Sequence, residues 1–233
     1  MVNNWLNSIQ ARLYPATCVL CGARGESNRD LCAGCLEDLP RPGSSCGCCG
    51  LPVPGTAGEL LCAACLRDPP AFDRTRVLYD YAPPVDQMIR QLKYAGRLHL
   101  ARLFGMQLAT LAAEVPAADC VVPVPLHRSR LRERGFNQAI ELARPVARAL
   151  AAPLDTRSCY RARATTAQAS LSRTARRENL KGAFTVRHEL NVRHVVIVDD
   201  VMTTGSTADE LAQALKAGGA AKVSVLVVAR AAR

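Results

Sequence analysis

Cysteine spacing constrains this chain more than any other feature of its sequence. Nine of its eleven cysteines lie between residues 18 and 65, in two segments that begin at Cys18 and Cys46. Aligned, both segments read C-x-x-C-G, a short insert, and then L-C-x-x-C-L-x-D-x-P, which is an internal repeat. Neither copy holds enough apolar residues to build a core of its own. Each copy therefore needs a crosslink or a metal to fold.

Two C-x-x-C pairs supply the four thiolates that bind a tetrahedral structural zinc ion. A disulfide framework would need an oxidising compartment, which nothing in the sequence indicates. Gly22 and Gly50 follow the first pair of each copy and predict a tight turn under the metal. In "CGCCG" the two-residue spacing leaves Cys48 as the spare cysteine, and an interleaved pairing of the two copies stays open. The expected zinc ligands are Cys18, Cys21, Cys32 and Cys35 in one site and Cys46, Cys49, Cys62 and Cys65 in the other.

After Pro69-Pro70 the pattern changes to alternating strands and helices. Residues 74–97 predict a strand, a Pro-Pro turn and a helix. Further strands are expected within 119–127, 194–200 and 222–230, and helices within 98–115, 137–152 and 206–220, with Pro145 kinking or dividing the second of these helices. This alternation predicts a parallel α/β sheet flanked by helices. We expect two domains: residues 1–70, a zinc module with a short N-terminal helix (Trp5, Leu6, Ile9, Leu13), and residues 71–233, the α/β domain.

Positive charge is concentrated in one part of the chain. The formal net charge is +10, and residues 127–181 hold thirteen Lys or Arg against four Asp or Glu, a net of +9. Such a block predicts an anionic partner, either phosphates on a small molecule or a nucleic acid. A merely solvated basic face is the alternative. No apolar run approaches the roughly 20 residues of a membrane helix. The start "MVNNWLNSIQARLYP" lacks the apolar core of a signal peptide, which predicts a cytoplasmic protein without membrane insertion.

The segment "VVIVDDVMTTGST", residues 195–207, is the strongest candidate for a binding site. Asp199 and Asp200 end a strand without polar alternation, and ligands of open α/β sheets bind beyond such strand ends. The following "TTGST" leads into a helix N-terminus, where backbone N–H groups favour phosphate. Carboxylates repel phosphate, so the two aspartates should address hydroxyl groups of the ligand or a Mg²⁺ ion. A sugar 5-phosphate satisfies both parts of the site.

Two other nucleotide-binding motifs are absent from the sequence. A strand ending in Asp-Asp also occurs as the magnesium-binding strand of P-loop nucleoside triphosphatases, but the chain contains no G-x-x-x-x-G-K-[ST]. It contains no G-x-G-x-x-G either. A purely structural helix cap would explain Ser206 or Thr207 but not the paired aspartates.

The same segment resembles the phosphoribosyl pyrophosphate (PRPP) signature of type I phosphoribosyltransferases. The larger pattern resembles the competence-associated ComF family, through the cysteine units, "LKYAGR", "VVPVPLHRSRLRERGFNQA" and "ATTAQASLSRTARRENLKGAF". These motifs follow in order from about residue 15 to 230, with Cys48 as the one addition. The resemblance implies a type I phosphoribosyltransferase-like sheet preceded by a double zinc ribbon.

The resemblance also implies roles for individual residues. Asp199 and Asp200 would hold the ribose hydroxyls with Mg²⁺ nearby. The 5-phosphate would be held by Thr203, Thr204, Gly205, Ser206 and Thr207. The loop after the strand at 121–125 would bind pyrophosphate through His127, Arg128 and Arg130. Segments closing over the ligand would include Arg134, Gly135, Phe136 and Asn137, then Gln168, Arg176 and Asn179, and also Lys93.

Two functions follow from this resemblance. The first is transfer of a phosphoribosyl group from PRPP to an acceptor that the sequence does not identify. The second is a non-catalytic accessory of DNA uptake that binds PRPP or single-stranded DNA alongside other competence proteins. Intact aspartates and "TTGST" favour PRPP binding, whereas the basic block suits nucleic acid. The few aromatic residues near that block, Phe136, Tyr160 and Phe184, make a thin stacking platform for bases.

Overall fold

A computed structural model describes residues 16–26, 29–55, 60–163 and 180–232 of the 233-residue chain. The expected N-terminal helix and three residues of the predicted closing segments, Gln168, Arg176 and Asn179, lie outside the described residues. The chain divides into two compact units, residues 1–40 and 41–233. The second cysteine copy thus belongs to the same compact unit as the α/β half. The boundary predicted at residue 70 marks the change of sequence pattern, whereas the two compact units meet at residues 40 and 41.

The helices and strands follow the predicted alternation. The first unit contains α2 (Ala33–Glu37). The second contains α3 (Ala63–Arg67), β1 (Arg74–Asp80), α4 (Val85–Ala95), α5 (Leu98–Ala112), β2 (Cys120–Pro123), α6 (Arg128–Arg134), α7 (Gln138–Ala149), β3 (Cys159–Arg161), β4 (Phe184–Val186), β5 (His194–Met202), α9 (Ser206–Ala217) and β6 (Lys222–Arg230). Pro145 lies inside α7, which continues past it. Within the described ranges, no helix has the length and apolar character needed to cross a membrane.

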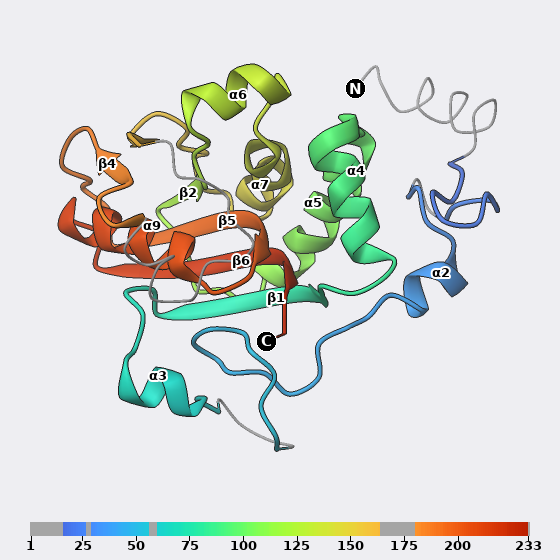
Figure 1. Cartoon of the computed structure of the whole chain (residues 1–233), viewed down its shortest axis with the longest axis horizontal. Helices are drawn as coiled ribbons and strands as arrows, with labels where there is room; N and C mark the ends of the chain where they lie inside the picture. The colour runs from blue at the N-terminus through green and yellow to red at the C-terminus, as the bar shows by residue number, and fades with distance from the viewer. Residues whose placement is uncertain (1–15, 27–28, 56–59, 164–179, 233) are drawn as a thin grey trace. The chain divides into compact units, whose positions relative to one another are not determined.

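The sheet of the second unit is parallel, in the order β1-β6-β5-β2. Helices α5 and α7 pack together on one face of this sheet, and α9 covers the other (Figure 1). Because both faces are covered, the central strand β5 is apolar and buried from Val195 to Val198. The prediction of a parallel sheet flanked by helices is confirmed, and the carboxyl ends of its strands lie at one edge.

Two elements differ from the sequence prediction. The strands β3 and β4 form a separate antiparallel pair that was not predicted. The expected loop carrying Arg128 and Arg130 is wrong, because these residues form α6. His127 caps that helix by accepting a hydrogen bond from the Ser129 N–H, and Gly135 ends it in the left-handed conformation. Arginine and leucine between these caps are good helix formers, so the basic tract folds locally.

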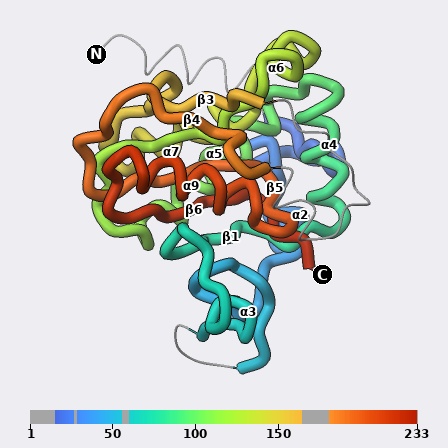
Figure 2. Tube along the Cα trace, turned by 60° about the vertical axis from the view of Figure 1, so that its left-hand side comes forward, coloured from blue at the N-terminus to red at the C-terminus, as the bar shows by residue number. Residues whose placement is uncertain are grey.

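The two cysteine copies have the same local structure. Each forms one isolated antiparallel bridge, Thr17 with Arg24 and Ser45 with Pro52, followed by a five-residue helix. In the second copy the chain runs beside β1, as both Figure 1 and Figure 2 show. There the Thr75 N–H donates to the Gly47 carbonyl over 3.1 Å. This copy is therefore part of the wall of the α/β unit.

Candidate functional site

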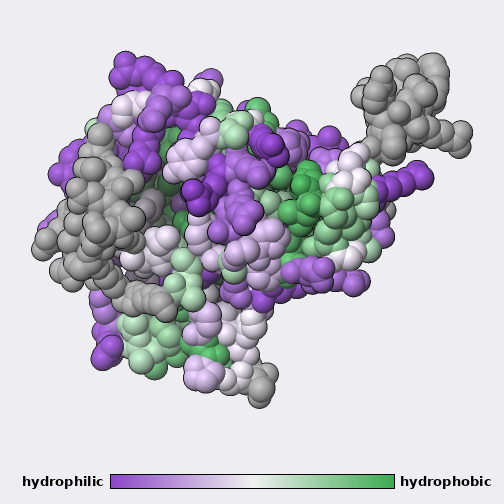
Figure 3. All heavy atoms as spheres, turned by 45° about the vertical axis from the view of Figure 1, so that its right-hand side comes forward, coloured by the Kyte–Doolittle hydropathy of each residue, from purple (hydrophilic) through white to green (hydrophobic). Residues whose placement is uncertain are grey.

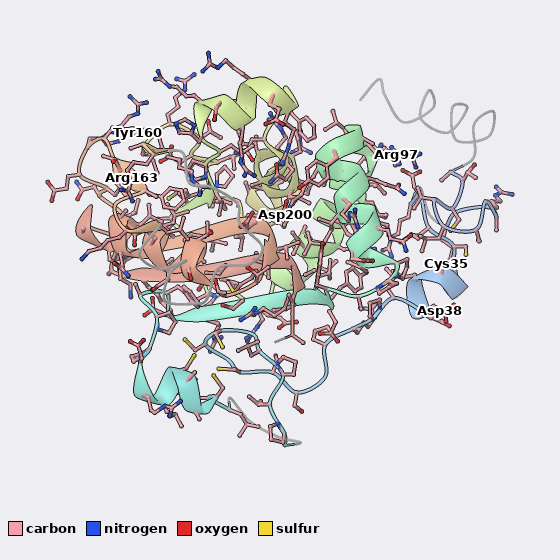
Figure 4. The ribbon with its side chains drawn as sticks, in the orientation of Figure 1. Cys35, Asp38, Arg97, Tyr160, Arg163 and Asp200 are labelled. Carbon is pink, nitrogen blue, oxygen red and sulfur yellow. The ribbon has the colours of Figure 1, made fainter. Side chains whose placement is uncertain are left out.

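Asp199 and Asp200 lie near the carboxyl end of the central strand β5, as predicted. Figure 4 shows Asp200 close to the middle of the α/β unit. The Asp199 carboxylate accepts a hydrogen bond from the Asp200 N–H over 2.8 Å, and the Asp200 carboxylate accepts one from the Val201 N–H over 2.6 Å. These local bonds orient both side chains.

Lys93 of α4 provides the positive charge beside this pair. Its Nζ lies 2.8 Å from Oδ1 of Asp200, whose side chain is only 4% exposed. Burial lowers the pKa of Lys93, but the charge of Asp200 and the hydrogen bond to it outweigh burial, so the pKa is raised. Lys93 therefore carries its charge in this site at neutral pH.

Asp199 is held differently from its neighbour. The residue as a whole is partly accessible to solvent. Burial, and then the negative charge of Asp200, raise the pKa of Asp199 to about 7. Close to neutral pH the pair is thus near the point at which one of its two carboxylates takes up a proton.

One oxygen of Asp200 identifies where a ligand fits. Its Oδ2 is buried and has no hydrogen-bond partner among the described residues. A buried carboxylate oxygen without a partner is costly. A ligand hydroxyl or a divalent cation would satisfy it, and carboxylate oxygens are ligands that Mg²⁺ prefers. The residues present therefore fit Mg²⁺ together with a hydroxylated ligand.

Residues 203–207, the predicted phosphate loop, follow Asp200 closely along the chain. Gly205 precedes α9 with φ +83°, which a glycine adopts without strain. No side chain caps α9, since its N-cap is this glycine. The Ser206 N–H donates to the Thr204 hydroxyl over 3.3 Å, and the two hydroxyls lie 2.9 Å apart. Hydroxyls and helix N–H groups thus gather at one point, an arrangement that favours an anion.

Three of the predicted cationic residues come together beside the aspartates. Lys93, Arg130 and Arg134 line a pocket of about 430 Å³, together with Tyr94, Gly96, Phe136 and one acidic residue, Glu133. The Arg134 guanidinium lies 5.7 Å from the centre of the Tyr94 ring. In Figure 3 hydrophilic side chains gather at the top of the molecule, where α6 lies. This pocket combines positive charge with aromatic edges.

Other predicted residues of this region have structural roles. His127 and Arg128 are not among the described residues that line the pocket. Asn137 was expected in a closing segment, but it is buried and caps α7 by accepting from the Ala139 N–H. Its side-chain amide also donates to the Val124 carbonyl over 3.0 Å. In this structure Asn137 therefore ties α7 to the end of β2.

Arg161 of β3 feels the charge of Asp199, a relationship that the sequence did not indicate. Burial lowers its pKa, as does the charge of Arg130, while Asp199 opposes the shift. Its guanidinium lies over the Phe184 ring at 5.5 Å. The β3–β4 pair therefore brings a cation into the field of Asp199. The segment "CYRAR" contains no motif that would have identified it.

The eight predicted zinc ligands form two sequential groups. The sulfur atoms of Cys18, Cys21, Cys32 and Cys35 lie within 4.8 Å of one another, and so do those of Cys46, Cys49, Cys62 and Cys65. A tetrahedron with zinc–sulfur bonds of about 2.3 Å places sulfurs about 3.8 Å apart. The Cys21–Cys32 and Cys49–Cys62 sulfur distances are both 3.7 Å. Gly22 and Gly50 have φ +77° and +68°, as the predicted turns require.

The chain is similar to known protein families and to named proteins over most of its length. The family model "Double zinc ribbon domain" matches residues 9–66, and "Phosphoribosyl transferase domain" matches residues 137–233. The chain is 39% identical over 208 residues to the DNA utilization protein YhgH of Escherichia coli, covering 86% of this chain and 90% of that protein. It is 32% identical over 224 residues to Competence protein F of Haemophilus influenzae, covering 92% and 96%. The chain belongs to the ComF family.

ComF membership confirms the predicted family and fold class, a phosphoribosyltransferase-type sheet with an N-terminal double zinc ribbon. A solved structure of glutamine PRPP amidotransferase from B. subtilis is 20% identical to this chain in sequence. The match covers 59% of this chain and 30% of the amidotransferase chain, with a TM-score of 0.39. The roles of the individual residues in this ComF protein stay predictions.

Proposed function

We propose that this ComF protein binds PRPP with Mg²⁺ and transfers its phosphoribosyl group to an acceptor. The observation that carries the proposal is the junction of β5 and α9. There a buried carboxylate oxygen without a partner among the described residues, Oδ2 of Asp200, lies on the strand that leads into an anion site of hydroxyls and helix N–H groups. A sugar phosphate has both chemistries in one molecule.

Each part of the ligand has a matching part of the site. Asp199 and Asp200 would accept hydrogen bonds from the ribose 2- and 3-hydroxyls, and the phosphate loop would hold the 5-phosphate. Lys93, Arg130 and Arg134 would hold pyrophosphate in the pocket beside them. Arg161 would add a fourth cation on the side of Asp199.

The proposed reaction breaks the bond between the ribose anomeric carbon and the pyrophosphate oxygen. Electrons of that bond leave with pyrophosphate, and the acceptor donates a pair to the anomeric carbon. The chain orients the donor and stabilises the charge on the departing pyrophosphate with its cationic side chains. Mg²⁺, when bound, would add positive charge on the same oxygens. No protein nucleophile is needed.

The proposed setting is the handling of DNA during uptake. Relatives named for competence and for DNA utilization support this setting. We further propose that the protein works in the cytoplasm alongside other competence proteins. Two structural zinc ions would occupy the two cysteine groups.

Calorimetric titration with PRPP and Mg²⁺ tests the proposal. The wild type and the Asp199→Asn/Asp200→Asn variant are compared, with pyrophosphate release followed in the same samples. Saturable binding that is lost in the variant supports the site. Release of pyrophosphate with a candidate acceptor supports catalysis. No heat of binding in the wild type would overturn the PRPP proposal.

A second candidate is binding of single-stranded DNA by an accessory protein. The observation that favours it lies on the β3–β4 pair, where the Arg187 guanidinium stacks 4.6 Å from the centre of the Tyr160 ring. Tyr160 is 37% exposed, so its other face can receive a base. Figure 4 shows Tyr160 and Arg163 on the same side of the unit. Fluorescence anisotropy with a labelled oligothymidine would show weaker binding by Tyr160→Ala, with Tyr81→Ala as the control.

A further inference from the structure

Arg230, the last residue of β6, is the largest fully buried side chain of the described residues, with 1% of its surface exposed. Burying a guanidinium costs several kcal/mol unless its N–H groups find acceptors. A cation retained at such a position therefore indicates a specific connection. The site described above does not use this residue.

The hydrogen bonds of Arg230 join two segments far apart in the sequence. Its Nε donates to the Cys49 carbonyl over 2.9 Å. Its Nη1 donates to the Met202 carbonyl over 2.8 Å and to the Thr203 carbonyl. Cys49 is a member of the second cysteine group, and Thr203 begins the phosphate loop. One rigid side chain thus bridges the two.

A second set of contacts runs in parallel. The Ala71 N–H donates over 2.7 Å to the carboxylate of Asp209, in the first turn of α9. The Cys48 sulfur lies 3.8 Å from the Phe72 carbonyl. Between the second cysteine copy and the loop at 203–207 there is a cavity of only about 30 Å³. Its lining includes Cys65, Phe72 and Gly205. Residues of the second cysteine copy thus line this cavity together with residues 204–206 of the loop.

Charge strengthens the same connection. Four thiolates around Zn²⁺ carry a net charge of −2, while Arg230 carries +1. A guanidinium held at the Cys49 carbonyl is stabilised by this negative cluster in a medium of low dielectric constant. Loss of the metal would release the Cys49 backbone from the geometry that the four sulfur–zinc bonds impose.

We propose that Arg230 is a positioning residue through which the second zinc site holds the phosphate loop in its binding geometry. The inference rests on the proposed function only in assigning a phosphate to residues 203–207. It assigns to the second copy of the repeat a part in ligand binding beyond that of a structural staple.

Cys62→Ser and its repeat counterpart Cys32→Ser are the matched test, with zinc content measured for both. Hydrogen exchange of the amides at 203–207 is followed by mass spectrometry in the full chain. We expect amide exchange at 203–207 to be about tenfold faster in Cys62→Ser than in the wild type, because losing one buried hydrogen bond changes the opening equilibrium by about that factor. In Cys32→Ser we expect the exchange rate to be unchanged. PRPP affinity with Mg²⁺ should fall about 10- to 100-fold in the first variant alone.

Arg230→Lys keeps the proposal falsifiable if Cys62→Ser does not fold. Lysine retains the charge but cannot bridge both carbonyls with a planar fork, so exchange at 203–207 should rise while exchange within β5 stays slow. Unchanged exchange at 203–207 in Arg230→Lys, or equal exchange in the two cysteine variants after each has lost one zinc, overturns the inference. If PRPP does not bind even the wild type, the proposed function fails, but the exchange comparison still decides this inference.

Discussion

The ammonium group of Lys93 lies 2.8 Å from a carboxylate oxygen of Asp200, and the two residues come from α4 and β5, more than a hundred positions apart in the chain. This ion pair places a resident cation beside the carboxylate pair. The negative charge that would repel a polyanionic ligand is thereby partly offset. The first two predictions follow from this arrangement.

Replacing Lys93 should destabilise the fold, because it leaves the buried Asp200 carboxylate without its partner. We expect Lys93→Met to lower the free energy of unfolding by about 2 kcal/mol, measured by urea denaturation. Lys216→Met is the control, because its ion pair with Asp73 is partly exposed on both sides, at 32% and 38%. That control should cost less than about 1 kcal/mol. Equal losses in both variants would contradict the prediction.

The pH dependence of stability should report the protonation of Asp199. Its pKa is raised to about 7 by burial and then by the charge of Asp200, whereas an unfolded aspartate has a pKa of about 3.9. The folded state holds the proton more tightly, so the free energy of unfolding should fall as pH rises from about 4 to about 7.

Asp199→Asn removes this titration. The variant should therefore gain stability relative to the wild type between pH 5 and pH 8, by about 1 kcal/mol or more. A stability difference that is the same at both pH values would show that Asp199 does not titrate in this range. In the wild type, affinity for PRPP with Mg²⁺ should rise through pH 7 as the carboxylate ionises.

Gly205 should be required for its backbone conformation and not for space. An added Cβ would lie 3.8 Å from its nearest neighbours, which is ordinary contact, but φ is +83°. We expect Gly205→Ala to cost about 1 kcal/mol of stability and to weaken PRPP binding in calorimetry. Gly43→Ala, which meets nothing within 4 Å and has no positive φ, should change neither. Full PRPP affinity in Gly205→Ala would argue against the loop as the phosphate site.

Arg161 of β3 and Arg187, the residue after β4, should separate the two candidate functions. Arg161 lies in the field of Asp199, whereas Arg187 stacks on Tyr160. Arg161→Met should weaken PRPP binding about tenfold, equivalent to about 1.4 kcal/mol, and Arg187→Met should leave it unchanged. Oligothymidine binding should respond in the opposite order. If Arg161→Met and Arg187→Met weaken the binding of PRPP and of oligothymidine equally, the two arginines act only as a basic surface.

The core of the site could be predicted from the sequence because its signals are local. The buried strand, the paired aspartates and the glycine before α9 follow one another within thirteen residues, 195–207. Strand burial, turn chemistry and helix start are each decided by neighbouring residues. The cysteine groups were predictable for the same reason, since each C-x-x-C pair is a local motif.

What could not be predicted depends on contacts between distant segments. The strands of Arg161 and Phe184 have three residues each, too short for a periodic signal, and they pair across more than twenty residues. Arg230 reads as the polar end of a strand, and its burial is explained by backbone carbonyls from other segments, among them those of Cys49 and Met202. The helix α6 was missed because its arginines suggested a ligand loop, although its caps at His127 and Gly135 are local signals.

The two copies of the cysteine repeat differ in one respect that bears on the living cell. In the first group Cys21 is exposed, Cys32 and Cys35 are partly exposed and Cys18 is buried; in the second, Cys46, Cys49 and Cys65 are buried and Cys62 is partly exposed. Metal exchange begins when a chelator reaches a sulfur atom. The first cysteine group should therefore lose its zinc faster than the second. Under zinc scarcity the protein would then lose the ion of the first group and keep the ion of the second group, which is proposed to support the loop at 203–207. Duplication of a single module would thus have produced one labile and one retained metal centre in the same chain.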